Sequence, residues 1–295
     1  MKKMLFVMNP FAGTRRANRH LVGILSIFNR AGYQVTAYMT AGPGDAAQIV
    51  EKLAPEMDVV TCCGGDGTFN ETVTGLMRSG AKAPIGYIPA GSTNDFATSL
   101  HLPTRILDAA RAIVEGKAFL YDVGSFADRY FSYVASFGAF TKASYATPQN
   151  VKNALGHAAY VLSGIQEITQ LHTTHMRLEL DEEMIEDDFL FGAISNSTSV
   201  GGVLTLRPDL VDMADGQFEV LLIRKPHTLA ELTECIHALQ TQQYNCRMIT
   251  FRSASKVHAI SAEPIVWTLD GERADEQQDT IIQNCHHAIS LLQKG

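Results

Sequence analysis

The sequence predicts an α/β N-terminal domain built on a parallel sheet, followed by a C-terminal domain that is an antiparallel β-sandwich. Strand and helix patterns alternate through residues 1–124, as expected when helices cover both faces of a parallel sheet. Short strand patterns separated by turns occupy most of residues 125–295, which is typical of a sandwich. The 295 residues, 46% of them hydrophobic, exceed one typical domain, so we expect two, 1–124 and 125–295.

The first domain begins with a strand and then alternates. The expected strands cover residues 4–8, 34–38, 59–63, 85–88 and 118–123. The expected helices cover residues 14–30, 45–53, 68–77 and 107–114. The strand at 59–63 is short, apolar and partly β-branched, which is typical of a parallel strand that is covered on both faces.

The second domain is expected to be mostly β. Its expected strands cover residues 130–136, 176–180, 189–195, 218–223, 248–252, 256–260, 265–269 and 289–292. Two helices interrupt them, one at about 151–170 with an apolar stripe and one that begins at Thr228. Thr228 and Glu231 have the spacing of a capping box, which fixes the start of that second helix.

Composition limits the class of protein. The net charge of −7 disfavours nonspecific nucleic-acid binding, so no nucleic-acid partner is expected. No stretch approaches the roughly 18 apolar residues of a transmembrane helix, and the apolar run after Lys3 is shorter than the ~7–15 residues of a signal-peptide core. Five cysteines, an odd number without metal spacing, fit reduced thiols in a cytoplasmic protein.

A glycine-rich acidic loop follows the buried strand 59–63 and reads Gly64-Gly65-Asp66-Gly67-Thr68. Glycines at a strand-to-helix turn let the backbone approach a ligand closely, and the first N–H groups of the helix can then point at a phosphate. Asp66 would repel that phosphate unless a divalent metal lies between them, so the loop suggests Mg²⁺.

A second loop follows the next strand and places Ser92, Thr93, Asn94 and Asp95 directly after Gly91. Any of these four side chains could simply cap the next helix, and for Ser92 and Thr93 taken singly that explanation is favoured. Because two consecutive strands end in glycine, hydroxyl, amide and carboxylate groups, we expect the two loops to face each other over a nucleotide phosphate.

These loops make the chain similar to a known family. Gly64–Thr68 with Asn70-Glu71, and the segment from Pro89 to Ala97, closely resemble the two nucleotide-site motifs of the diacylglycerol kinase catalytic family. The resemblance covers nearly the whole chain, through further matches at residues 9–13, 199–202, 215–216 and 270–272. It implies an N-terminal fold like that of NAD kinases and phosphofructokinases, which are distant relatives of the family.

The resemblance also implies the site residues. ATP would contact the loops and two hydroxyl groups: Asn9, Pro10, Phe11, Ala12, Gly13, Thr40, Gly64, Gly65, Asp66, Gly67, Thr68, Phe69, Asn70, Glu71 and Ser92. Asp66, Asp95 and Asp122 lie at or near predicted strand ends and are expected to hold a catalytic Mg²⁺ through water; for Asp122 the alternative is that a strand-end aspartate only caps a turn. A second, structural Mg²⁺ would be held by the Asp215 carboxylate and by main-chain oxygens of Asp212 and Gln217, and a plain surface turn is the alternative.

Glu272 is, by the same resemblance, the general base that takes the proton of a lipid hydroxyl, and Asp66 is the rival for that role. Residues 270–271, Asp-Gly, are also the commonest hairpin signal, so a plain turn is the competing explanation. A cluster formed by Arg15, Arg16 and Arg19 could reach phosphate or headgroup oxygens, or could be an ordinary solvated helix face.

We therefore expect an ATP- and Mg²⁺-dependent lipid kinase that converts diacylglycerol to phosphatidic acid. The alternatives are an NAD kinase, which shares the Gly64–Thr68 element but not the second loop, and a noncatalytic nucleotide- or lipid-sensing protein. The expected partner is a lipid at the membrane surface, met peripherally from the cytoplasmic side, and a homodimer is left open as an alternative to a monomer.

Overall fold

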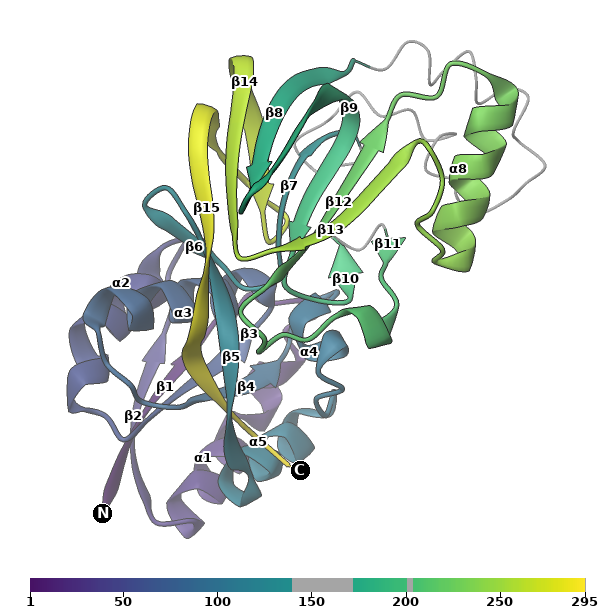
Figure 1. Cartoon of the computed structure of the whole chain (residues 1–295). Coiled ribbons are helices and arrows are strands. Elements are labelled where there is room, and N and C mark those ends of the chain that lie inside the picture. The colour runs from purple at the N-terminus through teal and green to yellow at the C-terminus, as the bar shows by residue number, and fades with distance from the viewer. Residues whose placement is uncertain (140–171, 201–203, 295) are drawn as a thin grey trace. The chain divides into compact units, whose positions relative to one another are not determined.

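The structure, a computed structural model, describes residues 1–139, 172–200 and 204–294 (Figure 1). The chain divides into two compact units. The first comprises Met1–Val123, Arg129–Ser132 and Cys285–Gly295, and the second comprises Gly124–Asp128 and Tyr133–Asn284. This division differs from the predicted ranges, because the end of the last strand, β15 (Glu272–Gln293), returns to the first unit.

The parallel part of the sheet in the first unit consists of four strands in the order β4-β3-β1-β2, and every pairing among them is parallel. Their bounds are β1 (Lys2–Met8), β2 (Tyr33–Met39), β3 (Val59–Gly64) and β4 (Ile85–Pro89). Met8 pairs with Cys63, and Gly64 pairs with Pro89, so the carboxyl ends of β1, β3 and β4 lie at one edge of the sheet. At the far side of β4, Leu291 of β15 pairs with Ile85.

Helices connect these strands. They are α1 (Leu21–Arg30), α2 (Asp45–Leu53), α3 (Asp66–Ser79), α4 (Asp95–Ser99) and α5 (Ile106–Glu115), with short 3₁₀ turns at Arg16–His20 and Ala54–Glu56. The helix expected at 14–30 is in fact divided, because Arg15 has the left-handed φ of 60° and a 3₁₀ turn follows it. Phe6 and Phe28 pack edge to face at 6.0 Å in the core between β1 and α1.

The second unit is an antiparallel β domain. Its strands are β7 (Val134–Gly138), β8 (Thr174–Leu180), β9 (Glu183–Ser195), β12 (Phe218–Arg224), β13 (Ile249–Ala254), β14 (Lys256–Leu269) and most of β15. Both β7 and β8 pair with the two long strands β9 and β14, so these four strands close into a circuit. Strands β12 and β13 extend it from β9.

Several predicted elements of this unit merge or divide. The strands expected at 256–260 and 265–269 are one strand, β14, in which the register shifts between Ile260 and Ile265. The strand expected at 130–136 is two strands, β6 (Arg129–Phe131) and β7. The helix expected at 151–170, and residues 201–203, lie outside the described residues.

The capping box is confirmed at the start of α8 (Leu229–Thr241). The Thr228 hydroxyl accepts from the Glu231 N–H at 3.2 Å, and the Glu231 carboxylate accepts from the Thr228 N–H at 3.2 Å. Each partner satisfies one helix-end donor of the other. Smaller elements of the unit are β10 (Ser199–Val200), β11 (Leu204–Thr205) and a 3₁₀ turn at Pro208–Leu210.

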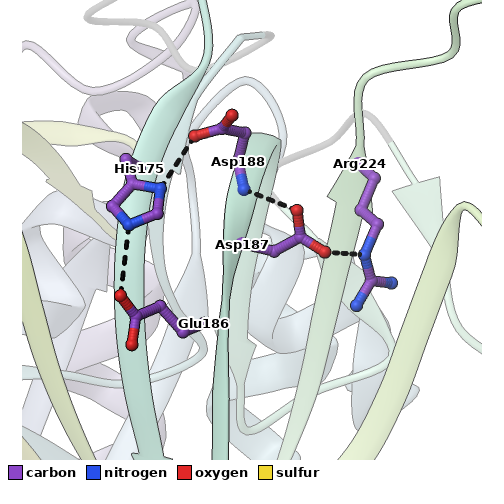
Figure 2. A network of polar contacts seen from close by, with 5 residues as sticks. All are labelled: His175, Glu186, Asp187, Asp188 and Arg224. Carbon is purple, nitrogen blue, oxygen red and sulfur yellow. Dashed lines mark hydrogen bonds and ion pairs between the residues drawn. The ribbon is translucent and has the colours of Figure 1, made fainter.

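A polar network lies across β8, β9 and β12 (Figure 2). Asp187 and Asp188 are consecutive in a strand, so their side chains point to opposite faces. Asp188 lies 2.9 Å from His175, whose other ring nitrogen lies 3.3 Å from Glu186, while Asp187 accepts from Arg224. The hydrogen bond with Asp188, followed by that with Glu186, raises the pKa of His175.

Candidate active site

The two glycine loops that follow β3 and β4 lie against each other. The Ala90 N–H donates to the Gly64 carbonyl at 2.7 Å. A Cβ atom built on Gly91 would lie 2.5 Å from the Cα of Gly65 and 2.8 Å from the Asn94 side-chain oxygen. A Cβ atom on Gly65 would lie 3.1 Å from the Cα of Gly91, so the approach leaves no room for a side chain at Gly91 and little at Gly65. The structure therefore brings the loops face to face, as the sequence predicts.

The Asn9–Gly13 turn, which follows β1, completes this edge. The Asn9 N–H donates to the Cys63 carbonyl at 2.9 Å, and its side-chain amide donates to the Thr68 hydroxyl at 3.2 Å. Gly13 has a φ of 49°, and a Cβ there would lie 2.5 Å from the Ala90 carbonyl oxygen. The first turn thus touches both glycine loops, so three strand ends form one continuous surface of backbone groups.

Asp66 is the first residue of α3, and its carboxylate reaches across to the second loop. One oxygen accepts from the Thr93 hydroxyl at 3.2 Å, and the other accepts from the Phe96 N–H at 3.3 Å. Burial raises the pKa of Asp66, the backbone N–H groups of Phe96 and Asp95 oppose that rise, and the nearby Asp95 carboxylate adds to it. Two carboxylates therefore share this corner, where like charges destabilise each other unless a cation or proton is present.

Asn94 shapes the second loop, although the sequence analysis did not assign it a role in binding. It adopts the left-handed conformation with φ 55° and ψ 52°. Its side-chain oxygen accepts from the Gly91 N–H at 2.8 Å, and its amide donates to the Gly91 carbonyl at 3.2 Å. The side chain thereby closes the turn and leaves Ser92 and Thr93 exposed at its tip. Asparagine tolerates this conformation, and that is the signal that could have identified it.

Phe69 is part of the hydrophobic core. Its ring is fully buried and stacks on Phe96 at 4.4 Å and against Tyr87 at 4.5 Å between centroids. These contacts fix α3 against β4 and α4, and so they hold the two glycine loops in register. The contribution of Phe69 to the predicted ATP site is this support.

The two polar residues that follow Phe69 form hydrogen bonds with the backbone of neighbouring elements. The Asn70 side chain donates to the Tyr130 carbonyl at 3.0 Å. The Glu71 carboxylate accepts from the Gly44 N–H at 2.8 Å and the Ala46 N–H at 3.1 Å, at the start of α2. A carboxylate there satisfies unpaired helix donors and complements the helix dipole. Glu71 therefore caps a neighbouring helix.

The remaining ATP candidates lie at the same edge of the sheet. Thr40 is buried, and its N–H donates to the Met8 carbonyl at 2.9 Å, directly after β2. In the first turn, the Phe11 N–H donates to the Asn9 side-chain oxygen at 2.9 Å, while the Phe11 ring is exposed and lies 5.4 Å from the Arg15 guanidinium. Pro10 and Ala12 complete this turn, and the Ala12 N–H donates to the Asn9 carbonyl at 3.3 Å.

Asp122 lies further from the end of its strand than the expected range 118–123 placed it, because β5 (Lys117–Phe126) continues for four residues beyond it. Its buried carboxylate accepts from the His287 N–H at 2.7 Å and lies 3.1 Å from the Nδ1 atom of His286. The sequence could not show this pairing, since the two strands are 164 residues apart at this point.

In the second unit, Glu272 is the first residue of β15 and is exposed. Asp270 and Gly271 have φ values of 49° and 80°, and Leu269 pairs with Glu272, so the Asp-Gly pair does form a tight hairpin. The buried Asp270 carboxylate accepts from the backbone N–H groups of Tyr133 and Val134 at 2.9 and 3.0 Å. The hairpin is therefore anchored to β7, and it carries the exposed Glu272 side chain.

The loop predicted to hold a structural metal is an acidic turn before β12. The Asp212 carboxylate accepts from the Ala214 N–H at 3.0 Å, and the Asp215 carboxylate accepts from the Gln217 N–H at 2.9 Å. The Gln217 carbonyl accepts from the Asn284 side chain at 3.0 Å. These oxygens each keep a further lone pair for a cation.

Glu219, two residues further on, is 2% exposed, and one of its carboxylate oxygens has no hydrogen-bond partner. Burial raises the pKa of Glu219 to about 8, and the charges of Asp215 and Asp212 add to the rise. The side-chain oxygen of Asn284 is likewise buried without a partner. Buried oxygen atoms without hydrogen-bond partners, next to an acidic turn, are suitable ligands for a hard divalent cation.

Comparison with known proteins assigns the chain to a family. Residues 3–126 match the model of the diacylglycerol kinase catalytic domain, and residues 134–291 match that of the YegS C-terminal NAD kinase beta sandwich-like domain. A diacylglycerol kinase of Bacillus subtilis (strain 168) is 32% identical over 274 residues, which cover 92% of this chain and 90% of the relative. The chain belongs to the diacylglycerol kinase family.

Other members of the diacylglycerol kinase family are similar to this chain over most of its length. The diacylglycerol kinase of Staphylococcus saprophyticus is 31% identical over 273 residues, covering 92% of this chain and 89% of that one. A crystal structure of a diacylglycerol kinase from Bacillus anthracis str. Sterne superimposes with a TM-score of 0.79 at 23% identity, over 99% of this chain and 97% of that one, which shows the shared fold. The predicted catalytic domain followed by a C-terminal β-sandwich is thereby confirmed.

Proposed function

We propose that the protein is a lipid kinase that transfers the γ-phosphoryl group of ATP to the hydroxyl of diacylglycerol and yields phosphatidic acid and ADP. The bond from the lipid oxygen to the γ-phosphorus forms, the bond from that phosphorus to the β–γ bridging oxygen breaks, and the hydroxyl proton passes to a base. The observation that carries the proposal is the contact between the Gly64–Thr68 loop and the loop of Gly91, with Asp66 and Asp95 beside it.

The nucleotide is proposed to bind to the first unit. The three loops after β1, β3 and β4 supply backbone N–H groups, and Thr40 and Ser92 supply hydroxyls, at the carboxyl edge where parallel sheets place ligands. The parallel pairing of β1 to β4 supports the further proposal that this domain has the fold of NAD kinases and phosphofructokinases. The second loop, which contains Pro89 and Gly91, favours a lipid kinase over an NAD kinase, because it resembles a motif of the diacylglycerol kinase catalytic family that NAD kinases do not share.

A catalytic Mg²⁺ is proposed to be held by Asp66 and Asp95, together with Asp122. The donor chemistry fits, because burial and then the nearby Asp95 charge raise the pKa of the Asp66 carboxyl group, and a divalent cation between the two carboxylates would remove their repulsion. When bound, Mg²⁺ neutralises charge that develops on the transferred phosphoryl group. The chain's own contribution is to fix the Asp66 carboxylate through Thr93 and Phe96.

A second Mg²⁺ is proposed at Asp212, Asp215 and Gln217, where its role is structural. The unpartnered, buried oxygens of Glu219 and Asn284 support it, because a cation would satisfy groups that otherwise stay unpaired. All of these donors are oxygens, which suits Mg²⁺.

We propose Glu272 as the general base. Glu272 is exposed at an anchored hairpin and is available to a substrate hydroxyl, whereas both oxygens of the Asp66 carboxylate already accept hydrogen bonds. Asp66 is the rival for this role. The pH profile of kcat distinguishes the two residues, because replacing the general base changes that profile.

The lipid is proposed to be met at the inner surface of the membrane by a peripheral, cytoplasmic protein. In the part of the chain that the structure describes, no helix is long and apolar enough to cross a membrane. A homodimer is proposed as an alternative to the monomer, and sedimentation velocity of the purified protein distinguishes the two.

The experiment that tests the proposed function uses γ-labelled ATP, Mg²⁺ and a panel of acceptors in mixed micelles. The panel contains diacylglycerol, phosphatidylglycerol and a long-chain base, with NAD as a separate acceptor. We expect label in phosphatidic acid. Label found only in NADP would overturn the proposal, and binding of ATP without any transfer would favour a sensing protein.

A further inference from the structure

His286 and His287 are consecutive residues of β15, yet their rings lie on the same side. In a regular strand, successive side chains point to opposite faces. His287, however, has a φ of 52°, in the left-handed region, and the two rings stack with centroids 3.6 Å apart and planes 27° apart. Residues other than glycine are disfavoured in that conformation, so the local backbone carries strain in order to hold both imidazoles together.

The buried carboxylate of Asp122 contacts both histidines. Asp122 is fully buried in β5, while the side chain of His286 is 51% exposed. The Nδ1 atom of His286 lies 3.1 Å from the Asp122 carboxylate oxygen, and the His287 N–H donates to that same oxygen at 2.7 Å. One possible ligand atom from each of the three residues lies within 4.8 Å of the others. The group thus combines one buried carboxyl group with two exposed imidazoles.

We propose that Asp122, His286 and His287 form a binding site for a zinc-class metal, meaning Zn²⁺, Co²⁺ or Ni²⁺. Two imidazoles and a carboxylate are three protein ligands, and water would occupy a fourth position. With metal–ligand bonds of about 2.0–2.2 Å and tetrahedral angles, neighbouring ligand atoms stand about 3.3 Å apart. The observed 3.1 Å between His286 and Asp122 is close to that separation, and the His287 ring, the third member of the group, is exposed.

The nitrogen ligands decide which metal the site takes. Imidazole suits zinc, cobalt and nickel, whereas Mg²⁺ prefers oxygen ligands. A metal held here would join β5 to β15 across 164 residues of sequence, so its effect is to stabilise the first unit. The site shares Asp122 with the proposed catalytic Mg²⁺ site, but it is tested apart from phosphoryl transfer, because metal binding and stabilisation are both measured without ATP or lipid.

The test is a cobalt titration of the whole protein, with any histidine tag removed and bound metal stripped by EDTA. Visible absorption of bound Co²⁺ reports the ligand set, and the thermal midpoint is recorded with and without Zn²⁺. His286→Ala removes one ligand. His287→Gly removes another and relieves the left-handed strain, so it keeps the fold. His175→Ala is the matched control, because His175 is also an exposed histidine between two carboxylates.

We expect one Co²⁺ per chain with the spectrum of a four-coordinate nitrogen and oxygen site, retained in millimolar Mg²⁺, and a higher thermal midpoint with Zn²⁺. His286→Ala and His287→Gly should each weaken binding by at least about tenfold, since even outer-shell partners of a metal cost that much. His175→Ala should bind as the wild type does. Unchanged binding in His287→Gly, loss of binding in His175→Ala, or displacement of Co²⁺ by Mg²⁺ would each overturn the proposal.

Discussion

Glu219 is a buried carboxyl group whose replacement by glutamine gives a calculable effect on stability. Burial raises the pKa of Glu219 from 4.5 to about 8 in the folded protein. Between these two values the folded state holds a proton that the unfolded state has lost. The free energy of unfolding therefore falls as pH rises from about 4.5 towards 8, because the unfolded state binds fewer protons there. Glu219→Gln removes this titration.

The magnitude follows from the two pKa values. At about 1.36 kcal/mol for each pKa unit, this group lowers the free energy of unfolding by roughly 3 kcal/mol between pH 5 and pH 8. The variant lacks this loss. Relative to the wild type, the free energy of unfolding of Glu219→Gln should therefore be higher by about 3 kcal/mol more at pH 8 than at pH 5. Any constant cost of the amide in the buried site cancels in that comparison.

Urea unfolding at pH 5, 6, 7 and 8 in EDTA measures the effect. Trp267 is the one tryptophan of the sequence and is buried in β14, so its fluorescence reports the unit that contains Glu219. Glu263→Gln, at an exposed position of β14, is the matched control for the substitution itself. Equal differences between variant and wild type at pH 5 and pH 8 would refute the reasoning.

Adding Mg²⁺ extends the same experiment to the proposed structural metal. If a cation binds beside Asp215, it stabilises the ionised form of Glu219, and the advantage of the variant at pH 8 shrinks. An advantage that Mg²⁺ does not change would argue against a cation at this loop.

Three further predictions concern the catalytic groups, the core and the exposed histidine. Asp66→Asn and Glu272→Gln should each abolish measurable phosphoryl transfer, a loss of about 10²-fold or more in kcat, and ordinary kcat in either variant removes that residue from the mechanism. Phe69→Ala should lower the free energy of unfolding by about 3–5 kcal/mol, because its ring is fully buried between two aromatic rings, and a change under ~1 kcal/mol would contradict this packing. The hydrogen bond with Asp188 is the largest cause that raises the pKa of His175. The wild type should therefore be more stable than His175→Ala below about pH 6.5, and this difference should be lost as pH rises through the higher pKa of the folded state. A difference in stability that grows with pH would contradict this prediction.

Local signals in the sequence were sufficient for much of the fold. The helix expected at 45–53 is α2, Asp45–Leu53, and the strand expected at 59–63 is β3, because apolar periodicity and buried β-branched runs act over a few residues. The capping box at Thr228 is equally local. The facing glycine loops followed from one long-range rule, that parallel strands end at the same edge of a sheet.

Other features depended on contacts that no local pattern encodes. Glu71 was predicted to be part of a nucleotide-binding motif, yet its carboxylate caps helix α2. The N–H group that it accepts from belongs to Gly44, which lies 27 residues earlier. Asp122 meets its partners on a strand that comes 164 residues later. The return of β15 to the first unit likewise depends on its pairing with β4, which the expected strand at 289–292 did not indicate.

The most direct test of the account is the affinity for Mg²⁺-ATP of Gly91→Ala, measured by calorimetry. A Cβ at Gly91 would lie 2.5 Å from Gly65, so the two loops must separate, whereas nothing lies within 4 Å of a Cβ at Gly42, which makes Gly42→Ala the matched control. If the facing loops cradle the triphosphate, Gly91→Ala should weaken binding by roughly tenfold or more, equivalent to about 1.4 kcal/mol, and Gly42→Ala should not. Wild-type affinity in a folded Gly91→Ala protein would contradict the central claim.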